Sequence, residues 1–330
     1  RDRRGSDMTS SSALDAGRAA AAERHWADAY ELLARVDATD GLAASDLDLP
    51  VPVLPKLELL QHVGSFKPRG AFNRVLSAAH VPSAGLIAAS GGNHGAALAF
   101  VARSLGLRAE VFVPSSSPAM KRDRIASLGA TVHVVEGLYD DAQAAATARQ
   151  AATGALAVHP FEHPDVVAGQ GTMARELEHQ LAALGTDFDT VLVASGGGGF
   201  TAGQAAWFAG RKQVVSVEPE TSQCLRAARL AGAPVEVSVA GVAADSLGAK
   251  QLGSVAWSIV QHYVGASVTV TDDEIRAAQR LLWDRLRLVA EQGGATALAA
   301  LHSGAYTPAH GERGVVVVCG SNCDPATVVG

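Results

Sequence analysis

The sequence has few cysteines, little net charge and no long hydrophobic run. Cys224, Cys319 and Cys323 are odd in number and show no paired metal-ligand spacing, which argues against a disulfide framework and fits a reducing cytoplasm. Lys and Arg number 27 against 33 acidic residues, a net charge of −6. Such a chain lacks the concentrated positive charge that nucleic acids and anionic membranes attract. No run approaches the ~20 apolar residues of a membrane span.

The N-terminal segment carries no secretion signal. It begins RDRRGSDMTSSS, without an apolar core, and we therefore expect a cytoplasmic location. Because the first residue is not Met, we treat Arg1–Asp7 as a candidate cloning remnant. Leu14–Val36 is Ala-rich with helical spacing of apolar positions, which predicts a helical N-terminal arm within residues 1–36.

Short apolar runs alternate with helical segments from about Val51 onward. Hydrophobic residues make up 48% of the chain, enough for a sizeable core. The runs predict buried strands at Leu86–Ser90, Ala109–Pro114, Thr131–Val135, Thr190–Ser195, Gln213–Glu218 and Gly314–Cys319. The segments between them predict helices at Ala96–Leu105, Ala119–Leu128, Asp140–Thr153, Val166–Leu184, Phe200–Phe208 and Glu274–Leu288.

This alternation predicts the α/β class. One sheet would be large for 330 residues, so we expect two open, twisted, mostly parallel sheets with flanking helices and a cleft between them. Ligands in such folds bind beyond the carboxyl ends of the strands. The Gly- and Ala-rich stretch Pro234–Gly253 is expected to be a loop near that cleft.

A lysine stands beside a proline that suits a helix start. In Gly64–Ala71, GSFKPRGA, Pro68 fits the first helical position and places Lys67 at the helix start, at the positive end of the helix dipole. That position favours the neutral amine that Schiff-base chemistry needs. An arbitrary lysine is usually a solvated surface residue, so this segment is only suggestive by itself.

Two glycine-rich turns each join a predicted strand to a predicted helix. Ser90–Gly95, SGGNHG, can form a nest of backbone N–H groups for a carboxylate or phosphate, or an ordinary turn. Ser195–Phe200, SGGGGF, has four consecutive glycines. A mere turn explains these poorly, because ordering glycine costs much backbone entropy, whereas close approach to a phosphate explains them better.

Two further features leave alternatives open. Glu218 ends the next strand, about where a ribose-binding acid of a dinucleotide fold would stand, but the glycine run fits no G-x-G-x-x-G pattern. A nicotinamide-dependent enzyme is therefore a minority hypothesis. Cys319 ends the last apolar strand, where a small polar side chain can point into the cleft or a buried thiol can simply fill space.

Taken together, these segments resemble the serine/threonine dehydratase and serine racemase group of fold-type II pyridoxal-phosphate enzymes. The resemblance runs from about Leu57 to Asp324. It rests on an ordered series of motifs: LELLQHVGSFKPRGAF, ASGGNHG, HPFEHPDVVAGQGT, ASGGGGF, VSVEP, ADSLGAKQLG and VVVVCGSN. It implies a tryptophan synthase β-like fold with a large cofactor-binding domain, residues 1–79 and 164–330, and a small substrate-loop domain, residues 80–163.

The resemblance also implies a role for each matching residue. Lys67 is the catalytic residue and forms the Schiff base with pyridoxal 5'-phosphate, with Phe66 packed beside the cofactor. Asn93 bonds the phenolic oxygen of the cofactor, and Cys319 faces its pyridine nitrogen. The backbone of Gly196, Gly197, Gly198 and Gly199 holds the phosphate. The substrate carboxylate is received by Ser90, Gly91, Asn93 and His94, with Ser65 nearby.

The implied reaction is dehydration and deamination of a β-hydroxy amino acid, L-threonine or L-serine, to a 2-oxo acid and ammonia. A homodimer is expected because relatives are commonly dimers. No regulatory domain is expected after Asp324. The divalent-cation site of the group consists of an acid, a backbone carbonyl and a second acid. Glu218 and the carbonyl of Ser222 match the first two, but Cys224 stands in place of the second acid. We therefore expect no metal, since a hard cation wants oxygen ligands.

Other departures concern the substrate. Racemases carry a serine where this chain has Gly91, so racemisation is disfavoured. The common Glu-Pro-x-Gly-Ala stands here as Glu291–Ala295, EQGGA, and Leu59 and Val63 replace a usual Asn and Thr. Alternatives are another β-eliminating enzyme, β-replacement as in cysteine synthase, serine racemase, or a non-catalytic cofactor-binding protein.

Overall fold

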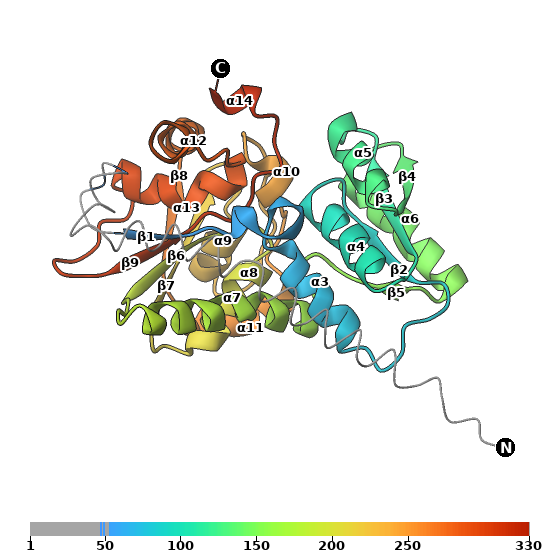
Figure 1. The fold of residues 1–330 in the computed structure, drawn as a ribbon, viewed down its shortest axis with the longest axis horizontal. Coiled ribbons are helices and arrows are strands. Elements are labelled where there is room, and N and C mark those ends of the chain that lie inside the picture. Colours follow the sequence, from blue (N-terminus) through green and yellow to red (C-terminus); the bar gives the residue numbers. More distant parts are fainter. Residues whose placement is uncertain (1–46, 48, 50–52, 330) are drawn as a thin grey trace.

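The computed structural model describes residues 47, 49 and 53–329. The helical arm predicted within residues 1–36, and the candidate remnant Arg1–Asp7, lie outside these residues. Two separate sheets form the framework, one in each half of the molecule (Figure 1). Every pairing between neighbouring strands in both sheets is parallel, as the alternation of strands and helices predicted.

The larger sheet has five strands in the order β1-β9-β6-β7-β8. Helices α12 and α13 lie on one side of it and helices α7, α8 and α11 on the other (Figure 1). Strands β1, β6, β7 and β9 are almost entirely buried, as is typical of parallel sheets covered on both faces, whereas the edge strand β8 is mostly half-exposed. The strands are β1 (Val53–Lys56), β6 (Thr190–Ala194), β7 (Gln213–Pro219), β8 (Val264–Val270) and β9 (Gly314–Val317). The helices are α7 (Pro164–Ala183), α8 (Gly199–Phe208), α9 (Cys224–Ala231), α11 (Ser254–Tyr263), α12 (Asp272–Leu286) and α13 (Gln292–Ser303).

The smaller sheet has four strands in the order β4-β3-β2-β5. All four come from residues 86–157, within the segment 80–163 for which we propose a small domain. The strands are β2 (Leu86–Ala89), β3 (Ala109–Pro114), β4 (Thr131–Val135) and β5 (Leu156–Ala157). The helices around it are α4 (Asn93–Ser104), α5 (Ala119–Ser127) and α6 (Tyr139–Thr153).

One helix connects the two halves. Helix α3 (Lys67–Leu76) packs on α7 of the larger half and on α4 of the smaller half. Two short 3-10 turns, η1 (Glu58–Leu60) and η2 (His62–Gly64), lead into it from β1. Its first residue is Lys67 and its second is Pro68, so the helix begins one residue before the predicted first position, and Lys67 lies at the helix start as predicted.

The six strands and six helices predicted from the sequence are present with small differences at their ends. The expectation of burial is wrong for β4, which is an edge strand with half-exposed residues. The prediction missed β1, β5 and β8, several helices including α9, α11 and α13, and the short α10 (Ala244–Leu247) and α14 (Ala326–Val329). Strand β8, VGASVTV, mixes glycine and hydroxyl residues with valine, and α13 begins QGG, so neither carries a clear apolar pattern.

Two further findings concern the predictions made from the cysteine content and from the lack of long apolar runs. Cys224, Cys319 and Cys323 are all free thiols. Within residues 47, 49 and 53–329, no helix combines the length and the apolar character that crossing a bilayer requires.

Candidate active site

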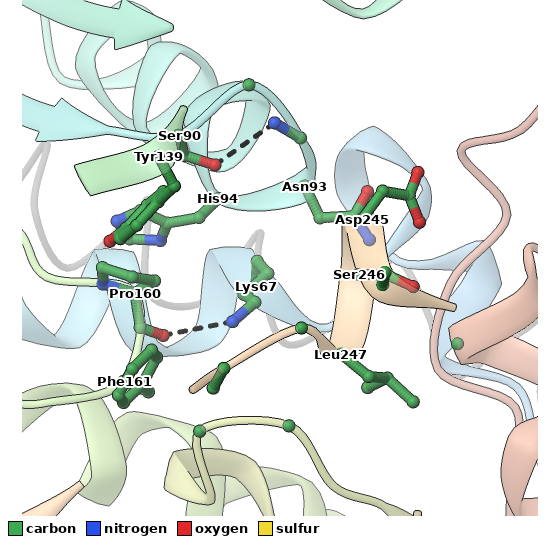
Figure 2. A pocket seen from close by; sticks show the side chains of 18 of the residues that line it. Lys67, Ser90, Asn93, His94, Tyr139, Pro160, Phe161, Asp245, Ser246 and Leu247 are labelled. Carbon is green, nitrogen blue, oxygen red and sulfur yellow. Dashed lines mark hydrogen bonds between the residues drawn. The ribbon is translucent and has the colours of Figure 1, made fainter. Parts of the chain in front are cut away.

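A cavity of about 490 Å³ opens where the carboxyl ends of strands from both sheets meet. The segments that follow β2, β3, β4, β5 and β6 contribute to its lining, together with Cys319 after β9. Figure 2 shows Lys67 inside it, between the loop that carries Ser90 and His94 and the ring of Phe161. This is the location expected for a ligand site in parallel α/β folds. The predicted loop Pro234–Gly253 supplies residues 244–251 of the lining.

The Lys67 amine lies in this cavity at the start of α3. Its Nζ donates a hydrogen bond to the carbonyl oxygen of Pro160, at 3.1 Å, and lies 5.0 Å from the centroid of the Phe66 ring. Burial lowers the pKa of this amine to about 8, against smaller opposing contributions from Cys319 and Glu291. A substantial fraction of the amine is therefore neutral near pH 8, and only the neutral form is nucleophilic.

A buried ionic network anchors the helix that carries Lys67. The guanidinium of Arg69 donates to both oxygens of Glu58, at 2.7 and 2.8 Å, and to Glu176 of α7 at 2.8 Å. Lys56 donates to Glu176 as well. The side chains of all four residues are at most 8% exposed. Two cations and two carboxylates balance, so the network ties the first turn of α3 to β1 and α7 without a net buried charge.

The four glycines after β6 form a closely packed turn. Gly198 has φ +84°, which favours glycine, and no side chain caps this end of α8. A Cβ at Gly197 would lie 2.6 Å from the ring of Phe161, and one at Gly199 would lie 2.8 Å from the Cβ of Phe161. The turn thus brings backbone to the cavity with no room for side chains, and the uncapped N-terminus of α8 suits an anion.

Aromatic rings cover the side of the cavity next to the glycine turn. Phe66 stacks on Phe200 with their ring centroids 3.8 Å apart and their planes 20° apart. Both rings line the cavity, as does Phe161. A flat aromatic ligand between Lys67 and the glycine turn would find apolar surfaces beside it.

The loop after β2 forms the opposite part of the cavity. Ser90, Gly91, Asn93 and His94 all line it, and Ser90 Oγ accepts a hydrogen bond from the backbone of Gly92 at 3.2 Å. No side chain caps the N-terminus of α4, which begins at Asn93. The loop therefore offers free backbone donors at a second helix N-terminus, as a carboxylate nest requires.

Two residues of this loop have definite surroundings. His94 Nε2 bonds the carbonyl oxygen of Val158 at 2.6 Å, and burial lowers the pKa of the ring to about 3. The imidazole is therefore neutral and held by the backbone, not poised as a base. A Cβ at Gly91 would overlap Oγ of Ser117 and lie 2.7 Å from its Cβ, so a side chain at this position would require Ser117 to move.

Cys319 lines the cavity from the end of β9. Its Sγ donates to the carbonyl oxygen of Gly293 at 3.4 Å, and burial raises the pKa of the thiol well above its usual range. The thiol therefore stays neutral and presents no negative charge to a ligand.

Three residues singled out from the sequence do not line the cavity. Ser65 is fully buried and pairs through its backbone with Gly320. Glu218 accepts hydrogen bonds from the backbone N–H groups of Leu225 and Arg226, and burial raises the pKa of its carboxyl to about 7. Ser222 donates to the carbonyl of Leu247. Among residues 47, 49 and 53–329, no three His, Cys, Asp or Glu side chains gather as a metal ion would need.

Several lining residues were not singled out from the sequence. They are Ser116, Ser117, Lys121, Leu138, Tyr139 and Asp245. Glu291 also lines the cavity; the sequence indicated it only as part of an altered motif, without a role in the site. Ser116 and Ser117 follow a predicted strand, so the rule that sites form at the carboxyl ends of strands could have found them. Lys121 and Asp245 form an ion pair across the cavity, which only the folded chain reveals.

The lining fits pyridoxal phosphate. An amine with a lowered pKa, an uncapped glycine turn for a phosphate, flat apolar surfaces and a neutral thiol meet in one cavity. The family model of the pyridoxal-phosphate dependent enzymes matches residues 39–320. The chain belongs to this family, and within it to the fold-type II group of serine/threonine dehydratases and serine racemases. The resemblance stated from the motifs is thereby confirmed.

Individual relatives are dehydratases and deaminases. The chain is 38% identical over 250 residues to the biosynthetic L-threonine dehydratase IlvA of Haemophilus influenzae, covering 74% of this chain and 48% of that protein. It is 37% identical to the phenylserine dehydratase of Ralstonia pickettii, covering 84% and 86%. The structure of the processed form of threonine deaminase isoform 2 from Solanum lycopersicum superposes with a TM-score of 0.79 at 28% identity, covering 91% of each chain. The chain spans about half the length of the biosynthetic IlvA relatives.

Proposed function

We propose that this protein eliminates water from a β-hydroxy amino acid, L-threonine or L-serine, and that a water molecule then hydrolyses the resulting free imine to a 2-oxo acid and ammonia. Threonine would give 2-oxobutanoate and serine pyruvate. The observation that carries the proposal is that the Lys67 amine, the Gly196–Gly199 turn and the Ser90–His94 loop line one cavity. Relatives named as threonine dehydratases support it.

Each wall of the cavity has a proposed role. When bound, pyridoxal phosphate supplies an electron sink that acidifies the Cα–H bond of the amino acid. The Lys67 amine binds the cofactor and, once released, takes the Cα proton as general base. The backbone N–H groups of Gly196–Gly199 bind the phosphate, and Phe66 and Phe200 exclude water from one side. Asn93 donates to the cofactor, and the neutral Cys319 thiol leaves its ring nitrogen without a charged partner.

The substrate carboxylate is proposed to bind the loop at the start of α4. Ser90, Gly91, Asn93 and His94 border that position, and the uncapped helix N-terminus favours a negative charge there. Ser65, which is buried and pairs through its backbone with Gly320, is proposed to lie near the substrate carboxylate, as the family resemblance implies. We also propose a homodimer in the cytoplasm, which sedimentation of the purified protein and fractionation of cells would check.

A second candidate substrate is a β-hydroxy amino acid with an aryl side chain. The phenylserine dehydratase matches over most of its own length. Leu138 and Tyr139 line the cavity and are 65% and 40% exposed, so an apolar surface is available to a larger side chain. The two candidates share one reaction and differ in the side chain at Cβ.

The test is a substrate panel on the purified holoenzyme. We expect keto-acid release from threonine, serine or phenylserine, and none from Lys67→Ala, whose visible cofactor band should also be missing. When pyridoxal phosphate is added to cofactor-free protein, the rate at which it reacts covalently with Lys67 should rise with pH and level off above about pH 8. The reason is that the neutral amine of Lys67 is the reacting form. Release of no keto acid from any of the three substrates would refute the lyase assignment.

A further inference from the structure

Glu291 is a buried carboxyl that the proposed chemistry does not yet use. It is 3% exposed and directly precedes α13, at the position where side chains commonly cap a helix. Its side chain makes no such cap. The backbone N–H of Glu291 donates to the carbonyl of Gly320 at 3.0 Å, and the side chain belongs to the lining of the cavity that holds Lys67.

One oxygen of Glu291 takes part in a chain of hydrogen bonds that includes Asn93. Asn93 Nδ2 donates to Glu291 Oε1, and Asn93 Oδ1 accepts from Asn322 Nδ2 at 2.6 Å. Asn322 Nδ2 also donates to the carbonyl of Val63 at 2.8 Å. An inverted Asn93 amide would set its oxygen against the carboxylate and its NH₂ against that of Asn322. Glu291 and Asn322 together therefore determine which way this amide points.

In this orientation, one of the two N–H groups of the Asn93 amide is not bonded to Glu291. An Asn NH₂ group has two hydrogens, and Glu291 takes one. Asn93 lines the cavity, so the second N–H is available to a ligand there. Any substitution that inverts or frees this amide would remove that donor.

The other oxygen of Glu291, Oε2, is buried and has no hydrogen-bond partner among the described residues. A buried carboxylate oxygen without a partner is unfavourable, so a proton or a donor from the bound group stabilises it. The charged and titratable groups that act on Glu291 or respond to it are Lys121 from α5, Asp245 from α10, Lys67 from α3, and the thiols of Cys319 and Cys323. Burial raises the pKa of this carboxyl to about 7, which the two lysines and Asn93 only partly oppose.

We propose that Glu291 is a positioning residue of the site, which fixes the Asn93 amide so that it presents an N–H to the cavity and which gains or loses a proton on Oε2 beside the bound cofactor. The proposal rests on the proposed function, because it takes Asn93 as a cofactor contact. Below the transition the carboxyl is neutral. Above it a negative charge stands in the cavity and stabilises positive charge on the cofactor and on Lys67.

The experiment is a pH titration of the visible absorption band of the holoenzyme without substrate. We expect a transition centred near pH 7 in the wild type and its loss in Glu291→Gln, which accepts from Asn93 but cannot titrate. Asn322→Ala should keep the transition and weaken cofactor binding about tenfold, since the amide loses its second constraint. Glu218→Gln is the matched control: Glu218 is equally buried and has a raised pKa, but it lies outside the lining, so the midpoint should not move.

Each outcome decides the proposal. A transition that persists unchanged in Glu291→Gln overturns it while leaving deamination intact. A wild-type protein with no visible cofactor band overturns the proposed function as well. If Glu291→Gln does not fold, difference infrared spectroscopy of Glu218→Gln between pH 6 and 8 reads the buried carboxylic acid of Glu291 without that of Glu218, whose pKa is also raised to about 7. Absence of the C=O band of Glu291 at pH 6 would then contradict the proposal.

Discussion

The two walls of the cavity each contain a glycine-containing turn at the uncapped N-terminus of a helix, but they are held in place by different kinds of contact. The lysine wall, Lys67 and Gly196–Gly199, is supported by the buried ions around Arg69 and by Phe161, which fills the space beside the glycines. The loop wall, Ser90–His94 with the turn Ser115–Pro118, is joined to the larger half by the Asn93–Glu291 bond and by exposed or half-exposed ion pairs. The wall at which we propose that the cofactor binds is therefore held by more buried contacts than the wall at which we propose that the substrate carboxylate binds.

The largest expected effect is the loss of stability on replacing Arg69, which holds the lysine wall. Arg69→Met leaves Glu58 and Glu176 with less compensation in a buried place, and we expect a loss of about 3–5 kcal/mol in the free energy of unfolding. Urea unfolding of the holoenzyme measures it. Arg149→Met is the matched control, since Arg149 pairs with Glu110 on the smaller sheet while 47% exposed. A loss for Arg69→Met no greater than for Arg149→Met would show that the buried network does not support the lysine wall.

A methyl group added to each glycine turn should weaken cofactor binding much more at the lysine wall than at the loop wall. Gly199→Ala places a Cβ 2.8 Å from the Cβ of Phe161, whereas Gly92→Ala places one 3.9 Å from the carbonyl of Asp245. Because overpacking commonly costs about 1–3 kcal/mol, we expect Gly199→Ala to weaken cofactor binding by about 10- to 100-fold. Gly92→Ala should change it by less than about threefold. Cofactor titration followed by absorbance compares the two, and equal losses would contradict the difference in packing.

The sequence allowed one wall to be predicted better than the other. Lys67, Pro68 and the four glycines are local signals, because a helix start and a tight turn are encoded by neighbouring residues. Strands β2, β3, β6 and β7 were likewise predicted from apolar runs. The Asn93–Glu291 bond joins residues 198 positions apart, and no local pattern encodes such a contact.

The same limit applies to space and charge in the site. Ser117 fills the position that a side chain at Gly91 would take, and Glu218 caps α9 with both oxygens. Both facts depend on how segments that are distant in the sequence pack together. A sequence motif indicated Glu218 as a metal-ligand candidate because it records residue type and order, not the partners that the fold supplies. The identity of a lining residue is therefore easier to predict than the state of its hydrogen bonds.

The smallest effect is expected at the ion pairs that join the loop wall to the larger half. Lys250 and Asp140 are 60% and 67% exposed, whereas Lys121, paired with Asp245, is 12% exposed. Exposed pairs contribute little, so Lys250→Ala should raise the KM for the amino acid by less than about twofold. Lys121→Ala should raise it more, because Lys121 is much less exposed and acts on Glu291. Steady-state kinetics at low and high salt compare the two, and a larger effect at Lys250 would mean that the exposed pair, not the less exposed pair beside Glu291, holds the loop wall in place.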